Sequence, residues 1–331
     1  MKKNRFSYGF YVLILVLLSS MFIGCSNSIE ADLEVQSQEN KSQSSQLQNG
    51  SSESLDKEGN AEADLVQGND SNLKQDEADS ESHVDAEENS KIRDESQRVE
   101  FEVKQGMYLT EILTNLVKAG WGESVENVLE HLEQMNREKY LIWSQIQNTG
   151  ERAFLAEGYI APGQYVWTED SSLEEVLDIL LGSWDELLTE DILKQAKQQG
   201  YSMDEILIMA SIVEWESSFD PSHVVKPNVA AVVRNRIESE TPLQMDVTIF
   251  YLQESLKPYR DPGQYEGYYD TYIRDGLPAG PIGSPSMDSI RAVLDPADTE
   301  DLFFVYDEAG NYYFAEDYEQ HLFNCELAGI Y

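Results

Sequence analysis

The folded part of this sequence is predicted to be α+β. Several segments carry apolar residues at helical spacing, and residues 109–118 are a clear example. Residues 99–103 alternate apolar and polar side chains, and residues 301–314 hold two strand-like runs around Gly310. Helices and strands are segregated along the chain, without the repeated strand–helix–strand period that indicates a parallel sheet.

The N-terminus has the layout of a secretory signal. Residues 1–5 are basic, residues 8–23 form an apolar run, and small residues lead to Gly24-Cys25. Gly24-Cys25 resembles a bacterial lipobox, in which the cysteine is lipidated, although Phe22 stands where leucine is usual. The alternative is an uncleaved membrane helix, for which the apolar run is short. In either form, residues 1–25 are expected to hold the protein on the extracytoplasmic face of the cell membrane.

Residues 26–98 are predicted to be a disordered acidic linker. They are rich in Ser, Gln, Asn, Glu and Asp and are nearly free of aromatic residues. Such a segment buries too little apolar area to offset the entropy lost on ordering. Because its like charges repel one another, the linker is expected to be extended and to act as a tether.

The net charge of −39 excludes nucleic acid as a partner, because phosphate binding needs a basic surface. An acidic surface is also poorly suited to lie on an anionic membrane, so an anchor must hold the protein there. The sequence has two cysteines, and lipid on Cys25 would leave Cys325 without an intrachain partner. Because the four His residues are scattered as well, no metal site is predicted.

The first folded domain is assigned to residues 99–198. A strand at 99–103 is followed by a helix at 109–118, which Gly120 ends, and by a second helix at 124–132. This order resembles a LysM-like module, and an ordinary small α+β unit is the alternative. The domain continues with a Gly/Pro-rich segment at 157–165, a helix opened by the capping box of Ser172 and Glu175, and a helix at 190–198.

The second domain, residues 199–331, is expected to hold the chemistry. Ser202 and Glu205 form a capping box, which opens a helix that runs to Glu216. A further helix is predicted at 229–237. Loops and short strands are expected after it, followed by the hairpin around Gly310.

The helix that ends at Glu216 is apolar nearly all round, which predicts a buried helix. Glu214 and Glu216 lie at its end and, two residues apart, point to different sides. A carboxyl against apolar surface has a raised pKa and can serve as a general acid, which glycosidic bond cleavage requires. The helix dipole also disfavours negative charge at this end. The alternative is that both are surface charges at a fraying helix end.

Glu216-Ser217 followed by Phe219-Asp220-Pro221 resembles the Glu-Ser signature of lytic transglycosylases. Further segments from residue 99 onward match the pattern of one group of these enzymes. In sequence order they are Glu157-Gly158-Tyr159, Ala210 to Glu214, Asn235-Arg236, Leu243 to Tyr251, Tyr269 to Tyr272, Gly276 to Ile282, and Ser289 through His321. Through these segments the chain resembles the endolytic murein transglycosylases (MltG-like or YceG-like). Departures from the family pattern are Asp270 for Asn, Val247 for Pro and Ser286 for Gly.

The resemblance implies cleavage of peptidoglycan glycan strands between N-acetylmuramic acid and N-acetylglucosamine, with 1,6-anhydro products and no cofactor. One carboxyl would act first as acid and then as base in a site that excludes water. Glu216 is the preferred acid, because a serine follows it, and Glu214 is the reserve candidate. The resemblance also implies wall-synthesis machinery as a partner. Candidate substrate-binding residues are Gln244, Asp246, Thr248, Tyr269 and Tyr272.

Two other functions stay open at this point. A hydrolytic muramidase would use a second carboxylate such as Asp246 to activate water, and would leave reducing ends. A non-catalytic lipoprotein that binds the cell wall, or a scaffold for wall synthesis, would suit the long tether. Product analysis separates the first from a transglycosylase, and an exposed Glu216 outside any cleft would favour the second.

Overall fold

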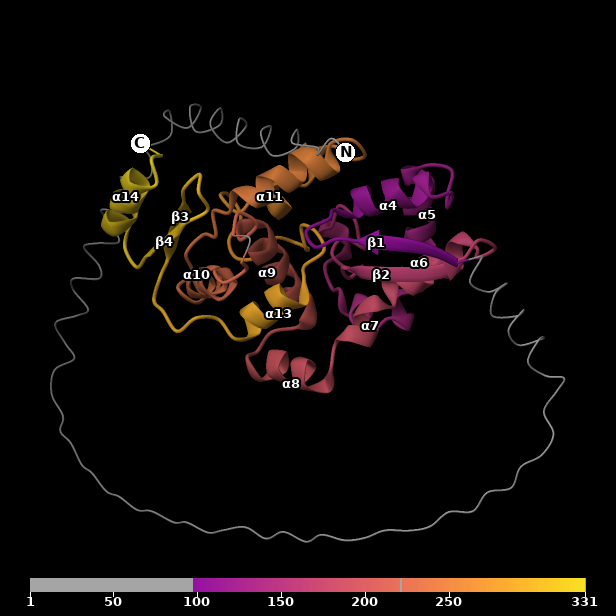
Figure 1. Ribbon diagram of the computed structural model, residues 1–331, viewed down its shortest axis with the longest axis horizontal. Coiled ribbons are helices and arrows are strands. Elements are labelled where there is room, and N and C mark those ends of the chain that lie inside the picture. The colour runs from indigo at the N-terminus through magenta and orange to yellow at the C-terminus, as the bar shows by residue number, and fades with distance from the viewer. Residues whose placement is uncertain (1–97, 221, 331) are drawn as a thin grey trace, which may run out of the picture. The chain divides into compact units, whose positions relative to one another are not determined.

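The computed structural model describes residues 98–220 and 222–330. Their helices and strands are labelled as in Figure 1. The predicted leader, its Cys25 and the linker lie outside these residues, apart from residue 98, and stay predictions. No helix within the described ranges is long and apolar enough to cross a membrane.

The N-terminal part is built on two paired strands. Strand β1 (Arg98–Val103) pairs antiparallel with β2 (Gly163–Thr168), and Phe101 lies opposite Tyr165. Between the strands lie helices α4 (Leu109–Lys118) and α5 (Val125–Gln134), which confirms the predicted strand–helix–helix order. Three short 3-10 turns connect α5 to β2, namely Arg137–Lys139, Trp143–Gln145 and Thr149–Glu151.

Three helices lead from this part to the rest of the chain. They are α6 (Leu173–Leu181), α7 (Ser183–Leu187) and α8 (Glu190–Gln198). The predicted capping box at the start of α6 is confirmed: the Glu175 amide donates to Ser172 Oγ at 3.2 Å, and the Ser172 amide donates to Glu175 Oε2 at 2.8 Å.

Helix α9 (Met203–Glu216) is the central element of the C-terminal part, and α10 (Lys226–Glu238) and α13 (Met287–Leu294) pack against it. Nearly all of its residues are buried, as its apolar sequence predicts. Its capping box is also confirmed, because the Ser202 amide donates to Glu205 Oε2 at 2.8 Å. Glu216 is its last residue, so its position depends on how the helix end is held.

The prediction of loops and short strands between residue 237 and the hairpin is wrong in part: loops cover much of that stretch, but short helices stand in place of the expected strands. The structure has α11 (Asp246–Phe250), a π-helical segment (Tyr251–Leu256), a 3-10 turn (Pro262–Gln264), α12 (Glu266–Tyr269) and then α13. Most of these helices have one or two turns, too short for a periodic pattern to show. Such helices depend on tertiary packing rather than on intrinsic propensity.

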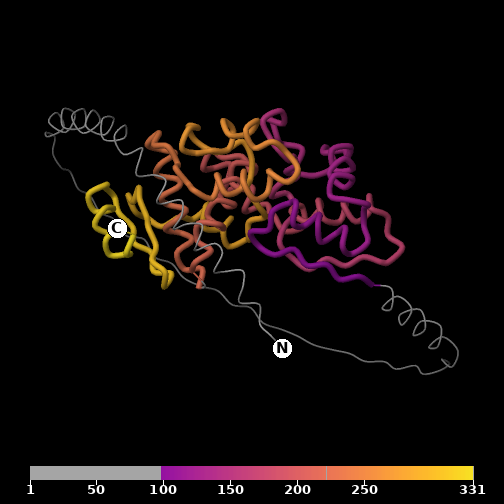
Figure 2. Tube along the Cα trace, turned by 90° about the horizontal axis from the view of Figure 1, so that it is seen from above, coloured from indigo at the N-terminus to yellow at the C-terminus, as the bar shows by residue number. Residues whose placement is uncertain are grey.

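The predicted C-terminal hairpin is confirmed. Strand β3 (Phe303–Tyr306) pairs antiparallel with β4 (Tyr312–Ala315), and Tyr306 lies opposite Tyr312. Helix α14 (Tyr318–Leu327) contacts both strands. In the tube view the hairpin and α14 lie together at the yellow end of the described chain, beside the orange-red α10 (Figure 2).

The residues before and after position 198 contact each other closely. The Gly106 amide donates to the Ser284 carbonyl at 2.7 Å, and the Ser284 amide donates to the Met107 carbonyl at 2.9 Å. The ring of Tyr108 stacks on that of Trp215, with centroids 4.9 Å apart. The helices and two separate strand pairs make the class α+β, as predicted. The domain boundary at residue 198 stays a prediction.

Candidate active site

Glu216 lies at the C-terminal end of α9 and is only 8% exposed. Burial raises the pKa of its carboxyl to about 8, and the negative charge of Asp246 adds to this effect. The guanidinium of Arg236 and a hydrogen bond from the Val247 amide act in the opposite direction. Glu216 therefore carries its proton at neutral pH, which is the state a general acid needs.

Asp246 and Tyr272 form an exposed polar pair near this carboxyl. Tyr272 Oη donates to Asp246 Oδ1 at 2.7 Å, and both residues are exposed, Tyr272 to 40%. Burial of its hydroxyl, followed by the charges of Asp246 and Glu216, raises the pKa of Tyr272. The buried acid therefore has exposed polar and aromatic groups beside it, which a sugar could contact.

Arg236 connects three segments around Glu216. Its Nε donates to the Leu302 carbonyl at 2.6 Å, just before β3, and its Nη1 donates to the Leu243 carbonyl at 2.5 Å. Its guanidinium also lies over the Phe303 ring at 5.3 Å. Because Arg236 is 7% exposed, its charge acts on Glu216 with little screening by water.

Tyr306 and Tyr312 complete the surroundings of Glu216 from the C-terminal hairpin. Tyr312 Oη donates to the backbone carbonyl of Glu216 at 2.6 Å. Burial raises the pKa of both tyrosine hydroxyls, and the charge of Glu216 raises each of them further. The candidate site therefore brings together α9, α10, α11, the loop after α12, and both strands of the hairpin.

Glu214 has the opposite environment. Lys226 Nζ lies 2.9 Å from its Oε2, and the hydroxyls of Ser286 and Ser289 donate to the same oxygen at 2.5 and 2.6 Å. Burial raises the pKa of Glu214, but the Lys226 charge and these hydrogen bonds outweigh it and hold the pKa below its usual value. Glu214 is thus an ionised, fully partnered carboxylate with no proton to give.

The remaining predicted substrate-binding residues divide into two kinds. Gln244 is exposed, and its backbone takes the left-handed conformation with φ of 47°. Thr248 is fully buried and its hydroxyl donates to the Met245 carbonyl at 2.8 Å. Tyr269 is fully buried too, with its ring 5.1 Å from that of Tyr251. Thr248 and Tyr269 offer no surface to a sugar. The Thr248 hydroxyl instead lies 3.2 Å from that of Thr271, whose carbonyl accepts from the Gln244 amide at 3.1 Å.

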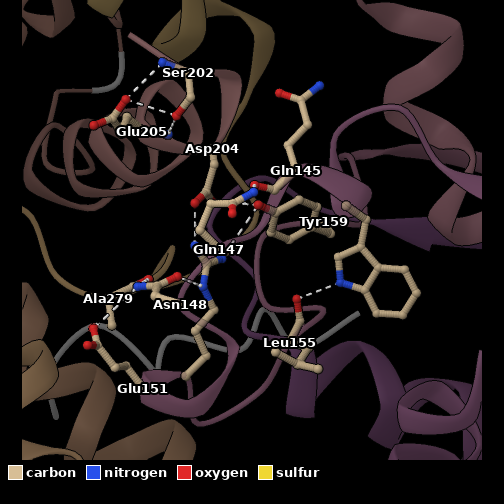
Figure 3. Close-up of polar contacts among 12 residues, drawn as sticks. Gln145, Gln147, Asn148, Glu151, Leu155, Tyr159, Ser202, Asp204, Glu205 and Ala279 are labelled. Carbon is tan, nitrogen blue, oxygen red and sulfur yellow. Dashed lines mark hydrogen bonds and ion pairs between the residues drawn. The ribbon is translucent and has the colours of Figure 1, made fainter. Parts of the chain in front are cut away.

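A polar network joins the Glu157-Gly158-Tyr159 segment to the first turn of α9 (Figure 3). Tyr159 Oη donates to Asp204 Oδ1 at 2.5 Å, and Arg152 forms an ion pair with the same aspartate. Asn148 Nδ2 donates to the Ala279 carbonyl at 2.8 Å, within the segment Gly276 to Ile282. This network holds the helix that carries Glu216 at the end opposite to that residue.

Glu157 is a second buried carboxyl, 1% exposed, and lies outside the site. Its Oε1 accepts a hydrogen bond from the Leu109 amide at 2.8 Å, which ties it to the start of α4. Burial raises its pKa to about 8. A raised pKa therefore does not by itself identify the acid, and the exposed polar groups beside Glu216 make the distinction.

The sequence did not assign roles to Arg236, Tyr306 or Tyr312. Asn235-Arg236 was visible as a matching pair, and the two tyrosines were visible only as residues of a hairpin. No local pattern connects Tyr312 to Glu216, because they are 96 residues apart.

Within residues 98–220 and 222–330, no group of three or more His, Cys, Asp or Glu side chains is placed to hold a metal ion.

A cavity of about 500 Å³ lies elsewhere, on the N-terminal part. None of the groups around Glu216 borders it. Its lining residues include Val99, Gly120, Trp121, Glu169, Ser171 and Leu173.

The chain belongs to the YceG-like family, whose model matches residues 66–326. It is 28% identical over 184 residues to a Streptococcus pneumoniae serotype 2 protein, and 30% identical over 169 residues to one from Bacillus subtilis. Both relatives are named endolytic murein transglycosylase. The matches cover 53% and 50% of this chain but only 32% and 46% of those relatives.

A crystal structure of a YceG-like protein from Listeria monocytogenes has the same fold. Its TM-score is 0.56 at 23% sequence identity, over 72% of this chain and 79% of the Listeria chain. This likeness supports the α+β architecture described above.

Proposed function

We propose that this protein is an endolytic lytic transglycosylase, which cleaves peptidoglycan strands between N-acetylmuramic acid and N-acetylglucosamine. The observation that carries the proposal is the buried Glu216 carboxyl, with a pKa of about 8, beside the exposed Asp246 and Tyr272. The names of the Streptococcus and Bacillus relatives support the same reaction.

In the first step, Glu216 donates its proton to the glycosidic oxygen while the bond from that oxygen to C1 of the muramic acid breaks. The positive charge that develops at the sugar is stabilised by the substrate's own N-acetyl group. In the second step, the Glu216 carboxylate takes the proton of the 6-hydroxyl, whose oxygen bonds to C1 and closes the 1,6-anhydro ring. Each proton given is recovered, and no water is consumed.

Arg236 and the Val247 amide stabilise Glu216 after the first step, when its carboxyl has lost its proton. Glu216 is then an anion in a buried site, and a nearby positive charge and a hydrogen bond both stabilise it. Asp246 acts in the other direction and favours the protonated state before the reaction. The balance between Asp246 and Arg236 lets one carboxyl serve as acid and then as base.

Glu214 is proposed to be structural. Its partners Lys226, Ser286 and Ser289 join α9 to the start of α10 and to α13. These partners lower the pKa of Glu214 and keep it ionised, so it is a poor candidate for proton donation.

The remaining parts would deliver this site to its substrate. The order β1–α4–α5–β2 supports the interpretation of this unit as a LysM-like module. We propose that it binds glycan strands together with the catalytic part. Residues 1–25, through lipid on Cys25 or as a membrane helix, would hold the protein on the outer face of the cytoplasmic membrane. The wall-synthesis machinery is the proposed protein partner there.

The test is incubation of the full-length protein with un-crosslinked glycan strands, followed by mass spectrometry of the products. Glu216→Gln removes the proton, and Glu326→Gln, an exposed change on α14, is the matched control. Anhydromuramic ends made by the wild type and by the control, but not by Glu216→Gln, would support the proposal. Reducing ends would identify a muramidase, and binding without cleavage would favour the scaffold.

A further inference from the structure

The backbone carbonyl of Glu216 is held by a residue from the other end of the C-terminal part. The last four carbonyls of a helix have no amide of their own helix to accept from. Tyr312 Oη donates to the Glu216 carbonyl at 2.6 Å, and the two residues are 96 positions apart. The hydroxyl thus caps the helix at the residue that carries the acid.

The hairpin that carries Tyr312 is packed firmly against the chain that follows Glu216. The ring of Tyr306 stacks on Phe219, with centroids 4.6 Å apart and an interplanar angle of 23°. The hairpin turn approaches the same residue closely: a Cβ on Gly310 would lie 2.7 Å from the Phe219 carbonyl oxygen. Gly310 also has a φ of +82°, so the turn needs glycine for two reasons.

The chain that leads into the hairpin is held by α10. Asn235 Nδ2 donates to the Thr299 carbonyl at 2.8 Å and to the Asp301 carbonyl at 2.9 Å, and Arg236 Nε donates to the Leu302 carbonyl at 2.6 Å. With β3 and β4 fixed by these contacts, the position of Tyr312 is set by the body of the protein. In Figure 1, β3 and β4 lie beside α10.

We propose that Tyr312 is a positioning residue for Glu216: its hydroxyl fixes the last turn of α9, and its ring, with that of Tyr306, closes the site to water on that side. This inference rests on the proposed function. It goes beyond that function in assigning the C-terminal hairpin a part in the chemistry.

Water that reached Glu216 would lower the pKa of its carboxyl, which is why the hairpin matters to the acid. Burial is the largest cause of the raised pKa of Glu216, so any loosening that admits water lowers that pKa. The charged and titratable groups that act on this carboxyl come from every neighbouring element: Arg236 on α10, Asp246 on α11, Tyr272 after α12, Tyr306 on β3 and Tyr312 on β4.

The test compares Tyr312→Phe with Tyr313→Phe. Tyr313 is the next residue on β4, and its hydroxyl donates to Asp307 Oδ2 at 3.1 Å within the hairpin, so it is a matched control. Full-length protein with ¹³C-labelled glutamate carboxyls is titrated by NMR, with Glu216→Gln to assign the signal. We expect Tyr312→Phe to move the Glu216 titration toward the ordinary pKa of glutamate, and Tyr313→Phe to leave it in place.

Kinetics on glycan strands add a second readout. Tyr312→Phe is expected to lower kcat by about tenfold with little change in KM, because a lost hydrogen bond displaces the acid and not the substrate. The loss of its activity at alkaline pH should begin at a lower pH than in the wild type. Thermal unfolding of both variants shows whether either has lost the fold.

The possible outcomes distinguish a failure of the role assigned to Tyr312 from a failure of the proposed transglycosylase function. A wild type that cleaves strands, with Glu216 titrating alike in the wild type and Tyr312→Phe, would overturn the role of Tyr312 alone. A wild type that does not cleave, with Glu216 titrating as an ordinary glutamate, would overturn the proposed function and this inference with it. If Tyr313→Phe shifts the titration as much as Tyr312→Phe does, the effect belongs to the hairpin and the inference fails.

Discussion

Glu214 and Glu216 lie two residues apart on one helix, and their carboxyls have opposite protonation states at neutral pH. Glu214 is 2.9 Å from the Lys226 ammonium and has a lowered pKa. Glu216 is buried near the negative charge of Asp246 and has a pKa of about 8. Such a separation of pKa values between neighbouring carboxyls indicates which one can act as an acid.

The pH dependence of cleavage follows from Glu216. Only the protonated form can donate, so kcat/KM is expected to be flat below its pKa of about 8 and to fall tenfold per pH unit well above it. Initial rates on glycan strands between pH 5 and 10 would measure this. An alkaline limb centred near the ordinary pKa of glutamate would argue against Glu216 as the acid.

Asp246→Asn is expected to shift that limb to lower pH. The change removes the negative charge that helps to keep Glu216 protonated, while an amide oxygen can still accept from Tyr272 Oη. Activity at pH 6 should therefore stay within about tenfold of the wild type, whereas removing a catalytic base costs roughly 10²–10⁴. A loss of the larger size at every pH would instead support the muramidase mechanism, with Asp246 activating water.

Glu214→Gln is expected to destabilise the fold. It leaves the Lys226 ammonium charged and buried, 2% exposed, without its counter-ion. Breaking one partner of a buried pair costs about 3–5 kcal/mol in the free energy of unfolding. Urea unfolding would measure the loss, and the double variant Glu214→Leu/Lys226→Met, which removes both charges, should recover part of it. Equal stability of Glu214→Gln and the wild type would show that the pair contributes little.

Glu157→Gln is expected to stabilise the protein at alkaline pH. The folded-state pKa of Glu157 is about 8, above that of the unfolded chain. Its contribution is therefore fully present below the unfolded pKa and is lost as pH rises through about 8, where a buried charge must form. The gain over the wild type should grow across that window to a few kcal/mol at most, at ~1.4 kcal/mol per pKa unit. Melting temperatures from pH 5 to 9 would test this, and a gain that does not change with pH would contradict it.

The regular elements could be predicted from sequence wherever the signal is local. The capping boxes at Ser172 and Ser202 marked two helix starts correctly, and Gly310 marked the hairpin turn. The short helices between residues 246 and 294 were missed, because segments of one or two turns take their conformation from what they pack against.

The candidate acid could be predicted as one of two glutamates, because an apolar helix that ends in Glu214 and Glu216 is visible in the sequence. The choice between them could not be made on physical grounds from the sequence. It depends on Lys226 and Ser289 reaching one carboxylate, and on Asp246 and Arg236 lying near the other.

The sequence by itself determined the α+β class, the buried helix α9 and the pair of carboxyls at its end, because burial and capping follow from residue type and spacing. Only the tertiary structure decided which carboxyl keeps its proton, that Thr248 and Tyr269 are core residues, and that Tyr312 holds the Glu216 carbonyl. The physical reason is that a pKa and a hydrogen bond depend on distances in space. Residues 96 positions apart come into contact only when the chain has folded.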